Sequence, residues 1–184
     1  MRIVAGSAKG VRLAPVPPGV RPVSDAAREG LFSSLAEQVP GARVLDLYAG
    51  TGAMAIEALS RGAEHAVLVE RDRAAVRTIR ENLERAKMGD RSEIVTTDVL
   101  SFVRTHDNLG PGPDLVFADP PYAIDQVELE AVLSALGSAG PADDGWRVVL
   151  TRPKKSSTPV IPVHWVLARR LTYGDTLVLI FREA

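Results

Sequence analysis

The sequence predicts an α/β fold in which a doubly wound, mostly parallel β-sheet carries helices on both faces. Short apolar runs alternate with segments whose apolar residues recur at helical spacing, an order typical of parallel strands joined by right-handed helical crossovers. A glycine-rich stretch, "YAGTG", follows the first of these apolar runs. The chain closes with two apolar segments around Tyr173-Gly174-Asp175, which predict an antiparallel hairpin at one edge of the sheet.

Each element has its own local signal. A helix over residues 24–39 is predicted from Ser24 or Asp25 as its N-cap, followed by apolar residues at helical spacing. A second helix, over residues 53–62, is closed by Gly62. Further helices are predicted at 73–89 and 125–137, and seven strands at 42–50, 65–72, 92–100, 113–122, 146–152 and, as the closing pair, within 164–184.

Residues 1–23 differ from the rest of the chain. This segment has no acidic residue and holds Arg2, Lys9, Arg12 and Arg21 among glycines and prolines. It is too short and too rich in proline to form a core of its own, so we expect a basic arm or small β-hairpin appended to a domain over residues 24–184. The glycines and prolines also predict that the arm becomes ordered mainly on a bound partner.

Composition excludes several function classes. The chain has 184 residues, 46% of them hydrophobic, which suits one domain with a full core. There are no cysteines, and the three histidines are far apart, so we predict no metal site. No apolar stretch is long enough for a membrane span, and the first ten residues lack the apolar core of a signal peptide, so we expect a cytoplasmic protein. The net charge of −1 argues against a protein that is basic throughout.

The first strand and the turn after it predict a nucleoside site. Gly50 and Gly52 allow the backbone to turn sharply and to approach a ligand directly before a helix N-terminus. Glu70 follows the second strand, where a carboxylate can accept hydrogen bonds from both hydroxyls of a ribose. In doubly wound sheets ligands bind at the carboxyl ends of the strands, so these residues are expected to lie together.

The glycines alone do not distinguish a dinucleotide from another nucleoside, because Gly50, Gly52 and Ala55 also fit G-x-G-x-x-G/A. Asp46 lies at the end of the first strand, where an acid is poorly suited to a pyrophosphate and well suited to a ligand with an amino group. Asp98, at the third strand end, can accept a hydrogen bond from an adenine amine, or it can cap the helix that follows. An NAD-dependent oxidoreductase remains an alternative.

The sequence "VFADPPY" places an acid, two prolines and an aromatic ring at the end of a buried strand. Prolines fix backbone dihedral angles, so Asp119 is predicted to be held in one position by Pro120 and Pro121. Tyr122 would then offer a ring face beside that acid. The alternative is a surface turn in which Asp119 is a cap and Tyr122 packs on a helix.

These motifs resemble a known class of enzyme. "VLDLYAGTG", "LVERD", "TTDVL" and "DPPY" are similar to the motifs of class I S-adenosylmethionine-dependent methyltransferases, whose Rossmann-like sheet has seven strands and an antiparallel C-terminal hairpin. "RIVAGSAKGVRL" and "RPVSDAAREGLFSSL" are similar to the N-terminal signature of the RsmD family. That family methylates the N2 amino group of a guanine in 16S ribosomal RNA of the small subunit, and the resemblance covers essentially the whole chain.

The resemblance implies roles for particular residues. Asp119 and the Pro120 carbonyl would accept the hydrogens of the guanine amine, Pro121 would help to fix the backbone, and Tyr122 would stack on the extruded base. S-adenosyl-L-methionine would be bound by Asp46, Tyr48, Gly50, Thr51, Gly52, Glu70, Arg71, Asp98 and Val99. The 16S RNA, within an assembling 30S subunit, would be bound by Arg2, Lys9, Arg12, Arg21 and Arg28.

One position departs from the expected pattern. Thr151 stands at the end of the fifth strand, where we expect an acidic residue, so the far wall of the base pocket is undefined by the sequence. Three alternatives also remain at this stage: methylation of adenine N6, methylation of a protein glutamine amide, and an RNA-binding assembly factor without catalytic activity. The N-terminal signature argues against the first two, and the intact acids at positions 70, 98 and 119 argue against the third.

Overall fold

The computed structural model describes residues 1–15, 23–105, 112–139 and 145–184. Its sheet has seven strands in the order β3-β2-β1-β4-β5-β7-β6. The first five are parallel, and β5, β7 and β6 pair antiparallel. The predicted fold class is therefore confirmed. The strands are β1 Arg43–Leu47, β2 His65–Val69, β3 Ser92–Val95, β4 Leu115–Ala118, β5 Arg147–Pro153, β6 Trp165–Tyr173 and β7 Thr176–Glu183.

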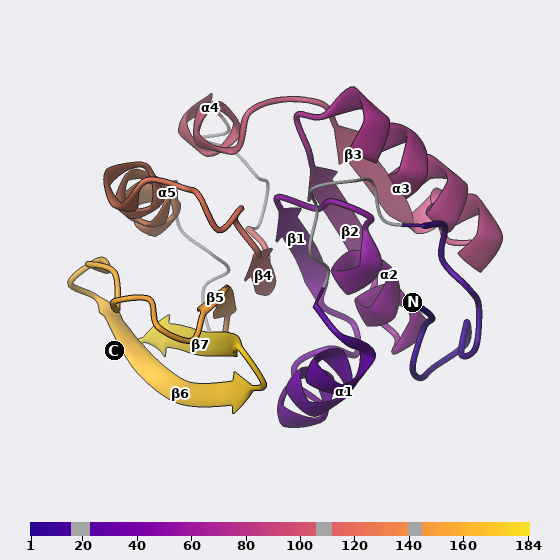
Figure 1. The fold of residues 1–184 in the computed structure, drawn as a ribbon, viewed down its shortest axis with the longest axis horizontal. Coiled ribbons are helices and arrows are strands. Elements are labelled where there is room, and N and C mark those ends of the chain that lie inside the picture. The colour runs from indigo at the N-terminus through magenta and orange to yellow at the C-terminus, as the bar shows by residue number, and fades with distance from the viewer. Residues whose placement is uncertain (16–22, 106–111, 140–144) are drawn as a thin grey trace.

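Helices cover both faces of the sheet, as Figure 1 shows. One face packs against α1, α2 and α3, with Leu31, Ile56 and Ile79 in its core. The other face packs against α4 and α5, with Phe102 and Leu129 in its core. Each face buries a row of strand side chains, which is the arrangement that stabilises a parallel sheet. The helices are α1 Asp25–Ser34, α2 Ala53–Ser60, α3 Arg73–Ala86, α4 Val99–Thr105 and α5 Gln126–Ala139, with a 3₁₀ turn η1 Gly89–Arg91.

The register of the central strands aligns their carboxyl ends. Leu47 of β1 lies beside Val69 of β2 and Ala118 of β4. The residues that follow these three positions therefore emerge at the same edge of the sheet. Strand order changes direction between β1 and β4, where doubly wound sheets bind their ligands. Among the described residues, no helix combines the length and apolar character that a membrane crossing requires.

The N-terminal arm is packed against the rest of the protein over residues 1–15. Ile3 and Leu13 are buried in the same core as α2 and α3. Backbone N–H groups of the arm donate to the Glu57 carboxylate, the Ser60 hydroxyl and the Asn82 amide oxygen, all of which belong to those helices. The expectation that the arm is ordered mainly by a partner is wrong for these residues, because their apolar side chains and polar backbone groups are already satisfied by the helices.

Residues 1–15 of the arm also pair with one another. A single antiparallel bridge joins Arg2 to Arg12, and neither neighbourhood forms a regular strand. Backbone hydrogen bonds join the two sides of the arm around this bridge. They run from the Ile3 N–H to the Val11 carbonyl at 3.0 Å, from the Gly10 N–H to the Ile3 carbonyl at 2.9 Å and from the Leu13 N–H to the Met1 carbonyl at 3.2 Å. The arm therefore pairs with itself and also packs on α2 and α3. Arg21, which was predicted to bind RNA, lies outside the residues that the structure describes.

Candidate active site

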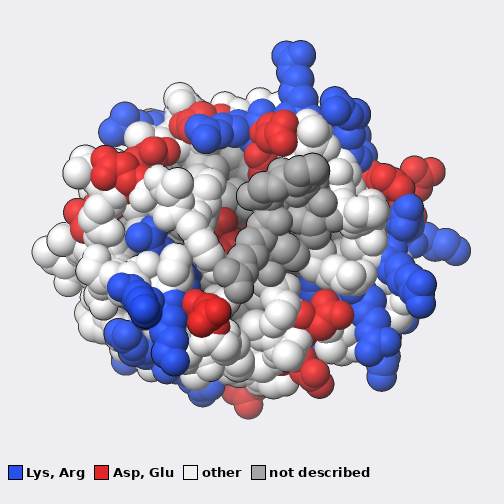
Figure 2. All heavy atoms as spheres, viewed as in Figure 1, with Lys and Arg blue, Asp and Glu red and all other residues white. Residues whose placement is uncertain are grey.

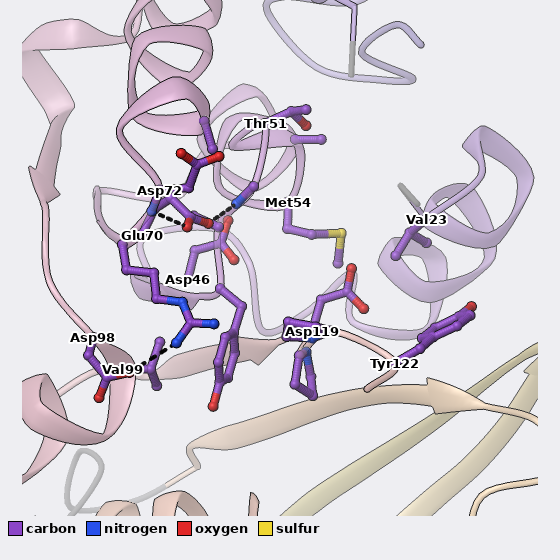
Figure 3. Close-up of a pocket in the computed structure, with 18 of the residues that line it drawn as sticks. Val23, Asp46, Thr51, Met54, Glu70, Asp72, Asp98, Val99, Asp119 and Tyr122 are labelled. Carbon is purple, nitrogen blue, oxygen red and sulfur yellow. Dashed lines mark hydrogen bonds and ion pairs between the residues drawn. The ribbon is translucent and has the colours of Figure 1, made fainter. Parts of the chain in front are cut away.

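A cavity of about 460 Å³ opens at the carboxyl ends of β1, β2 and β4. Its volume is typical of a site for a small molecule or cofactor. Figure 3 shows Glu70 and Asp46 on one side of this cavity and Asp119 and Tyr122 on the other. The structure brings together nearly all of the predicted catalytic and cofactor residues here: Asp46, Tyr48, Gly50, Thr51, Glu70, Arg71, Asp98, Val99, Asp119, Pro120, Pro121 and Tyr122 all line the cavity.

The glycine-rich turn forms the floor between β1 and α2. Tyr48, Gly50 and Gly52 all have positive φ, at 59°, 58° and 75°, so the chain reverses tightly there. Gly52 precedes the first residue of α2, and a Cβ at this position would lie 3.1 Å from Leu68 Cδ2. A non-glycine residue there would be both strained and crowded. Gly52 therefore acts by shaping the turn, and it does not itself line the cavity.

Tyr48 is a non-glycine residue in the left-handed region, a conformation that costs energy and concentrates at functional sites. Its hydroxyl is buried and has no hydrogen-bond partner among the described residues. Burial raises the pKa of this phenol, with Glu128 and Asp98 adding to the effect. The ring is therefore a neutral part of the cavity wall.

Asp46 is buried at the end of β1, with 2% of its surface exposed. Its Oδ2 accepts a hydrogen bond of 3.1 Å from the Ala55 backbone N–H, in the first turn of α2. Burial raises the pKa of Asp46 well above its ordinary value, and the nearby carboxylates of Asp119 and Glu70 raise it further. A cationic ligand beside these acids would relieve their mutual repulsion.

Glu70 joins the glycine-rich turn to the start of α3. Its Oε2 accepts from the Gly50 backbone N–H at 2.9 Å, and its Oε1 accepts from the Asp72 backbone N–H at 2.8 Å. Each carboxylate oxygen can accept a second hydrogen bond. The two oxygens are therefore fixed in place and can still receive the two hydroxyls of a ribose.

Asp98 caps the helix that follows it. Its Oδ1 accepts from the Ser101 backbone N–H at 3.0 Å, which caps the start of α4. Its Oδ2 lies 3.8 Å from the guanidinium of Arg71, and both side chains are partly exposed. The predicted cap is thus observed. Because Asp98 and Val99 also line the cavity, contact with an adenine remains a prediction.

Asp119 faces the cavity from the end of β4. The Thr151 hydroxyl on β5 donates a hydrogen bond to Asp119 Oδ1. Burial raises the pKa of Asp119 to about 6, and the hydrogen bond from Thr151 opposes that rise. Pro120 is buried and Pro121 is exposed, while Tyr122 is 48% exposed at the rim. An acid fixed between the cofactor residues and an exposed ring is suited to holding a target group.

Sequence reasoning missed two features of this site. Thr151 appeared only as a departure from an expected acid, because its partner lies 32 residues away on another strand. Met54 and Val23 were not predicted at all, although both line the cavity. The only available signal for Met54 was its place one residue into α2 after the glycine-rich turn.

Arg28 corrects one prediction. It was expected to contact RNA, yet its side chain is fully buried under the arm and reaches only the wall of the cavity. Its Nη2 donates to the Arg2 carbonyl at 2.5 Å and to Asp25 Oδ1 at 2.9 Å. Its Nε and Nη1 have no hydrogen-bond partner among the described residues. In this structure Arg28 ties the arm to α1 and is not available to phosphates at the surface.

The donor set fits S-adenosylmethionine better than a dinucleotide. Asp46 lies near the end of β1, Glu70 and Asp98 follow the neighbouring strands β2 and β3, and all three line one cavity. Carboxylates suit the hydroxyls and positive charges of that cofactor, whereas they would repel a pyrophosphate placed at the glycine-rich turn. Together with the sheet order, this site defines a class I S-adenosylmethionine-dependent methyltransferase.

Comparisons with known proteins give the particular family. The family model described as "Conserved hypothetical protein 95" matches residues 1–182, and the chain belongs to this family, the RsmD family. "Putative rRNA methyltransferase YlbH" of Bacillus subtilis is 31% identical over 184 residues, covering 100% of this chain and 99% of the relative. "Ribosomal RNA small subunit methyltransferase D" of Escherichia coli K12 is 35% identical over 187 residues, covering 100% of this chain and 91% of the relative.

A solved structure agrees with these relatives. "Putative methyltransferase yhhF" from Escherichia coli superimposes with a TM-score of 0.84 at 33% identity, covering 100% of this chain and 97% of that one. The chain is thus a methyltransferase, and the prediction of an S-adenosylmethionine-dependent enzyme is confirmed.

Proposed function

We propose that this protein transfers a methyl group from S-adenosylmethionine to the N2 amino group of a guanine in 16S ribosomal RNA of the small subunit. The observation that carries the proposal is the position of Asp119, which is fixed by a neighbouring strand at the boundary between the cofactor residues and the exposed ring of Tyr122. The names of the two relatives, which state action on ribosomal RNA, support the class of substrate.

The chemistry requires an acceptor at Asp119. The lone pair of a guanine N2 is delocalised into the ring, so the nitrogen becomes nucleophilic only when its hydrogens are drawn toward fixed acceptors. In the proposal Asp119 accepts one hydrogen and the Pro120 carbonyl accepts the other, while Tyr122 stacks on the extruded base. When bound, the cofactor supplies an electrophilic methyl group. The protein then contributes alignment and electrostatics rather than a strong base.

The pKa of Asp119, about 6, fits this role. At neutral pH the carboxylate is mostly ionised, so it can accept a hydrogen bond from the amine. The nitrogen must lose one proton after the new N–C bond forms, and a carboxylate with this pKa can accept that proton or pass it to water. We therefore expect the methylation rate to fall as the pH drops through about 6.

The arm and α3 together form the surface proposed for RNA. Arg2, Lys9 and Arg12 are exposed, and Arg85 of α3 donates to the Arg12 carbonyl at 3.3 Å. Exposed arginines continue along the outer face of α3, and Figure 2 shows lysine and arginine side chains gathered on that side of the molecule. Such clusters neutralise phosphates locally even in a chain of net charge −1.

Residues 1–23 would supply the RNA-binding arm, and residues 24–184 would form the methyltransferase domain. The enzyme would act in the cytoplasm on RNA within an assembling 30S subunit. Arg21 would also bind RNA.

Nucleoside mass spectrometry of 16S RNA tests this function. RNA from cells that lack the protein should lose one N2-methylguanosine per small subunit, and the intact gene should restore it. A gene carrying Asp119→Ala should not restore it. If the missing nucleoside is N6-methyladenosine, or if ribosomal RNA is unchanged while a protein loses a methylated glutamine, the proposed substrate is wrong.

A further inference from the structure

Thr151 occupies a position that only the sheet defines. Ala118 of β4 lies beside Leu150 of β5, so the next residues along the two parallel strands, Asp119 and Thr151, are neighbours. On its other side Thr151 pairs with Val178 of β7. The residue is held in the interior of the sheet, with 3% of its surface exposed.

The Thr151 hydroxyl has one described partner, the carboxylate of Asp119. It donates to Oδ1, which leaves Oδ2 as the oxygen without an assigned hydrogen bond. Threonine is branched at Cβ and its χ1 angle is restricted, so a buried threonine on a strand keeps its hydroxyl in one direction. The contact therefore fixes the rotation of the Asp119 carboxylate as well as its position.

We propose that Thr151 is a positioning residue for methyl transfer, which holds the Asp119 carboxylate so that Oδ2 faces the amino group of the target base. This inference rests on the proposed function, because it takes Asp119 as the acceptor of the target amine. Thr151 stands where the sequence pattern led us to expect an acidic residue at this strand end. A second acid here would lie against Asp119 and repel it, whereas a hydroxyl donates to it.

The hydroxyl also affects the charge of Asp119. Burial raises the pKa of Asp119 to about 6, and the hydrogen bond from Thr151 acts in the opposite direction by stabilising the ionised form. Without the hydroxyl we expect a higher pKa and a carboxyl group that is partly protonated at neutral pH. The other charged side chains that line the cavity are Arg28, Asp46, Glu70, Arg71, Asp72 and Asp98.

A matched pair of substitutions separates the hydroxyl from the shape of the side chain. Thr151→Val removes the hydroxyl and keeps the volume, while Thr151→Ser keeps the hydroxyl. Single-turnover methylation of small-subunit RNA is measured for both between pH 5 and pH 9 at saturating S-adenosylmethionine. The titration of the Asp119 carboxyl carbon is followed by ¹³C NMR in the protein alone, with the signal identified by its loss in Asp119→Asn.

We expect the titration of Asp119 and the pH profile of the methylation rate to shift together. In Thr151→Val the midpoint of the Asp119 titration and the acidic limb of the rate profile should both move up by about one pH unit. The rate at pH 6.5 should fall about threefold as the ionised fraction of Asp119 falls, while S-adenosylmethionine affinity stays within about twofold. Thr151→Ser should restore most of the rate and the wild-type midpoint. If Thr151→Val does not fold, Thr151→Ala is expected to give the same shifts.

Two results would overturn the inference, and they are distinguishable. If the folded valine or alanine variant keeps the wild-type titration midpoint and rate profile while Asp119→Asn is inactive, Thr151 has no positioning role and the proposed function stands. If the wild-type protein methylates no small-subunit RNA at any pH, the proposed function fails, and the positioning role fails with it.

Discussion

The proposed cofactor side of the cavity, with Asp46, Glu70 and Asp98, and its proposed target side, with Asp119 and Tyr122, hold their acids in different ways. On the cofactor side, Asp46, Glu70 and Asp98 all accept hydrogen bonds from backbone N–H groups. On the target side, Asp119 accepts from the side chain of Thr151 on a neighbouring strand. Backbone donors persist when side chains change, whereas a hydroxyl is removed by one substitution. The cofactor side should therefore tolerate sequence change around it, and the target side should depend on particular neighbours.

The arm depends on an acid that accepts from both kinds of donor, backbone and side chain. Glu57 is fully buried on α2 and accepts from the Val4 and Ala5 backbone N–H groups at 2.8 and 3.0 Å. It also accepts from Arg61 Nε at 2.8 Å and lies 3.9 Å from Arg28 Nε. One side chain thus joins segments that are more than fifty residues apart in the chain.

The largest effect is expected at Glu57. Glu57→Ala leaves several buried donors without a partner, so it should lower the free energy of unfolding by about 3–5 kcal/mol. Urea denaturation measures the loss, and limited proteolysis should show cleavage near the N-terminus. Glu64→Ala, at an exposed position, should change stability by less than about 0.5 kcal/mol. An unfolding free energy close to wild type would show that the arm does not depend on Glu57.

Asp119→Ala tests the target side directly. It should slow single-turnover methylation by about 10²–10³-fold, or about 3–4 kcal/mol in activation free energy, because a fixed acceptor of the target amine is lost. Cofactor affinity, measured by calorimetry, should stay within about twofold. If S-adenosylmethionine binding falls by as large a factor as the methylation rate, Asp119 contacts the cofactor. The proposed division of the cavity into a cofactor side and a target side would then be wrong.

Glu70→Ala tests the cofactor side. It should weaken S-adenosylmethionine binding by about 1–3 kcal/mol, since a charge-assisted acceptor of the ribose hydroxyls is removed. Calorimetry measures the change, and NAD should not bind to either protein. Glu93→Ala, on the next strand and exposed, is the control and should bind normally. Detectable NAD binding by the wild-type protein would contradict the cofactor assignment.

Asp119→Asn tests the raised pKa of Asp119 through the pH dependence of the free energy of unfolding. The pKa of Asp119 is about 6 in the folded protein, above the ordinary value for aspartate of about 3.9, so ionisation of this group opposes folding. Its contribution to stability is fully present below pH 4 and is lost as the pH rises through about 6. Asp119→Asn should therefore be more stable than wild type by about 1–2 kcal/mol at pH 8 and equal at pH 4. Denaturation at both pH values measures this, and equal stability at pH 8 would refute the assigned pKa.

The smallest effects are expected for single charges on the arm. Lys9→Ala and Arg12→Ala should each weaken RNA binding by less than about 1 kcal/mol and reduce the salt dependence by about 0.7–0.9 per phosphate contact. Cofactor affinity should not change. Arg104→Ala, exposed on α4, serves as the control for nonspecific charge. If Arg104→Ala flattens the salt dependence of RNA binding as much as Arg12→Ala does, the RNA does not bind preferentially to the arm.

The order of elements and the cofactor side could be predicted from sequence because their determinants are local. Strands and helices follow from apolar spacing, and the partners of Glu70 and Asp98 lie within 20 residues of them. Ser24 was predicted as a possible N-cap, and it accepts from the Ala27 backbone N–H. Asp119 was also predicted, because the prolines beside it already imply a fixed backbone.

Only the tertiary structure decided the surroundings of Asp119 and the state of the arm. The register of β4 and β5 places Thr151 against Asp119, and burial in that position sets the pKa of the acid. The arm has the composition of a flexible segment, but α2 and α3 supply Glu57, Ser60 and Asn82 at the spacing of its backbone N–H groups. Hydrogen bonds and desolvation act through space, so residues 30 to 70 positions apart in the chain determine these properties together.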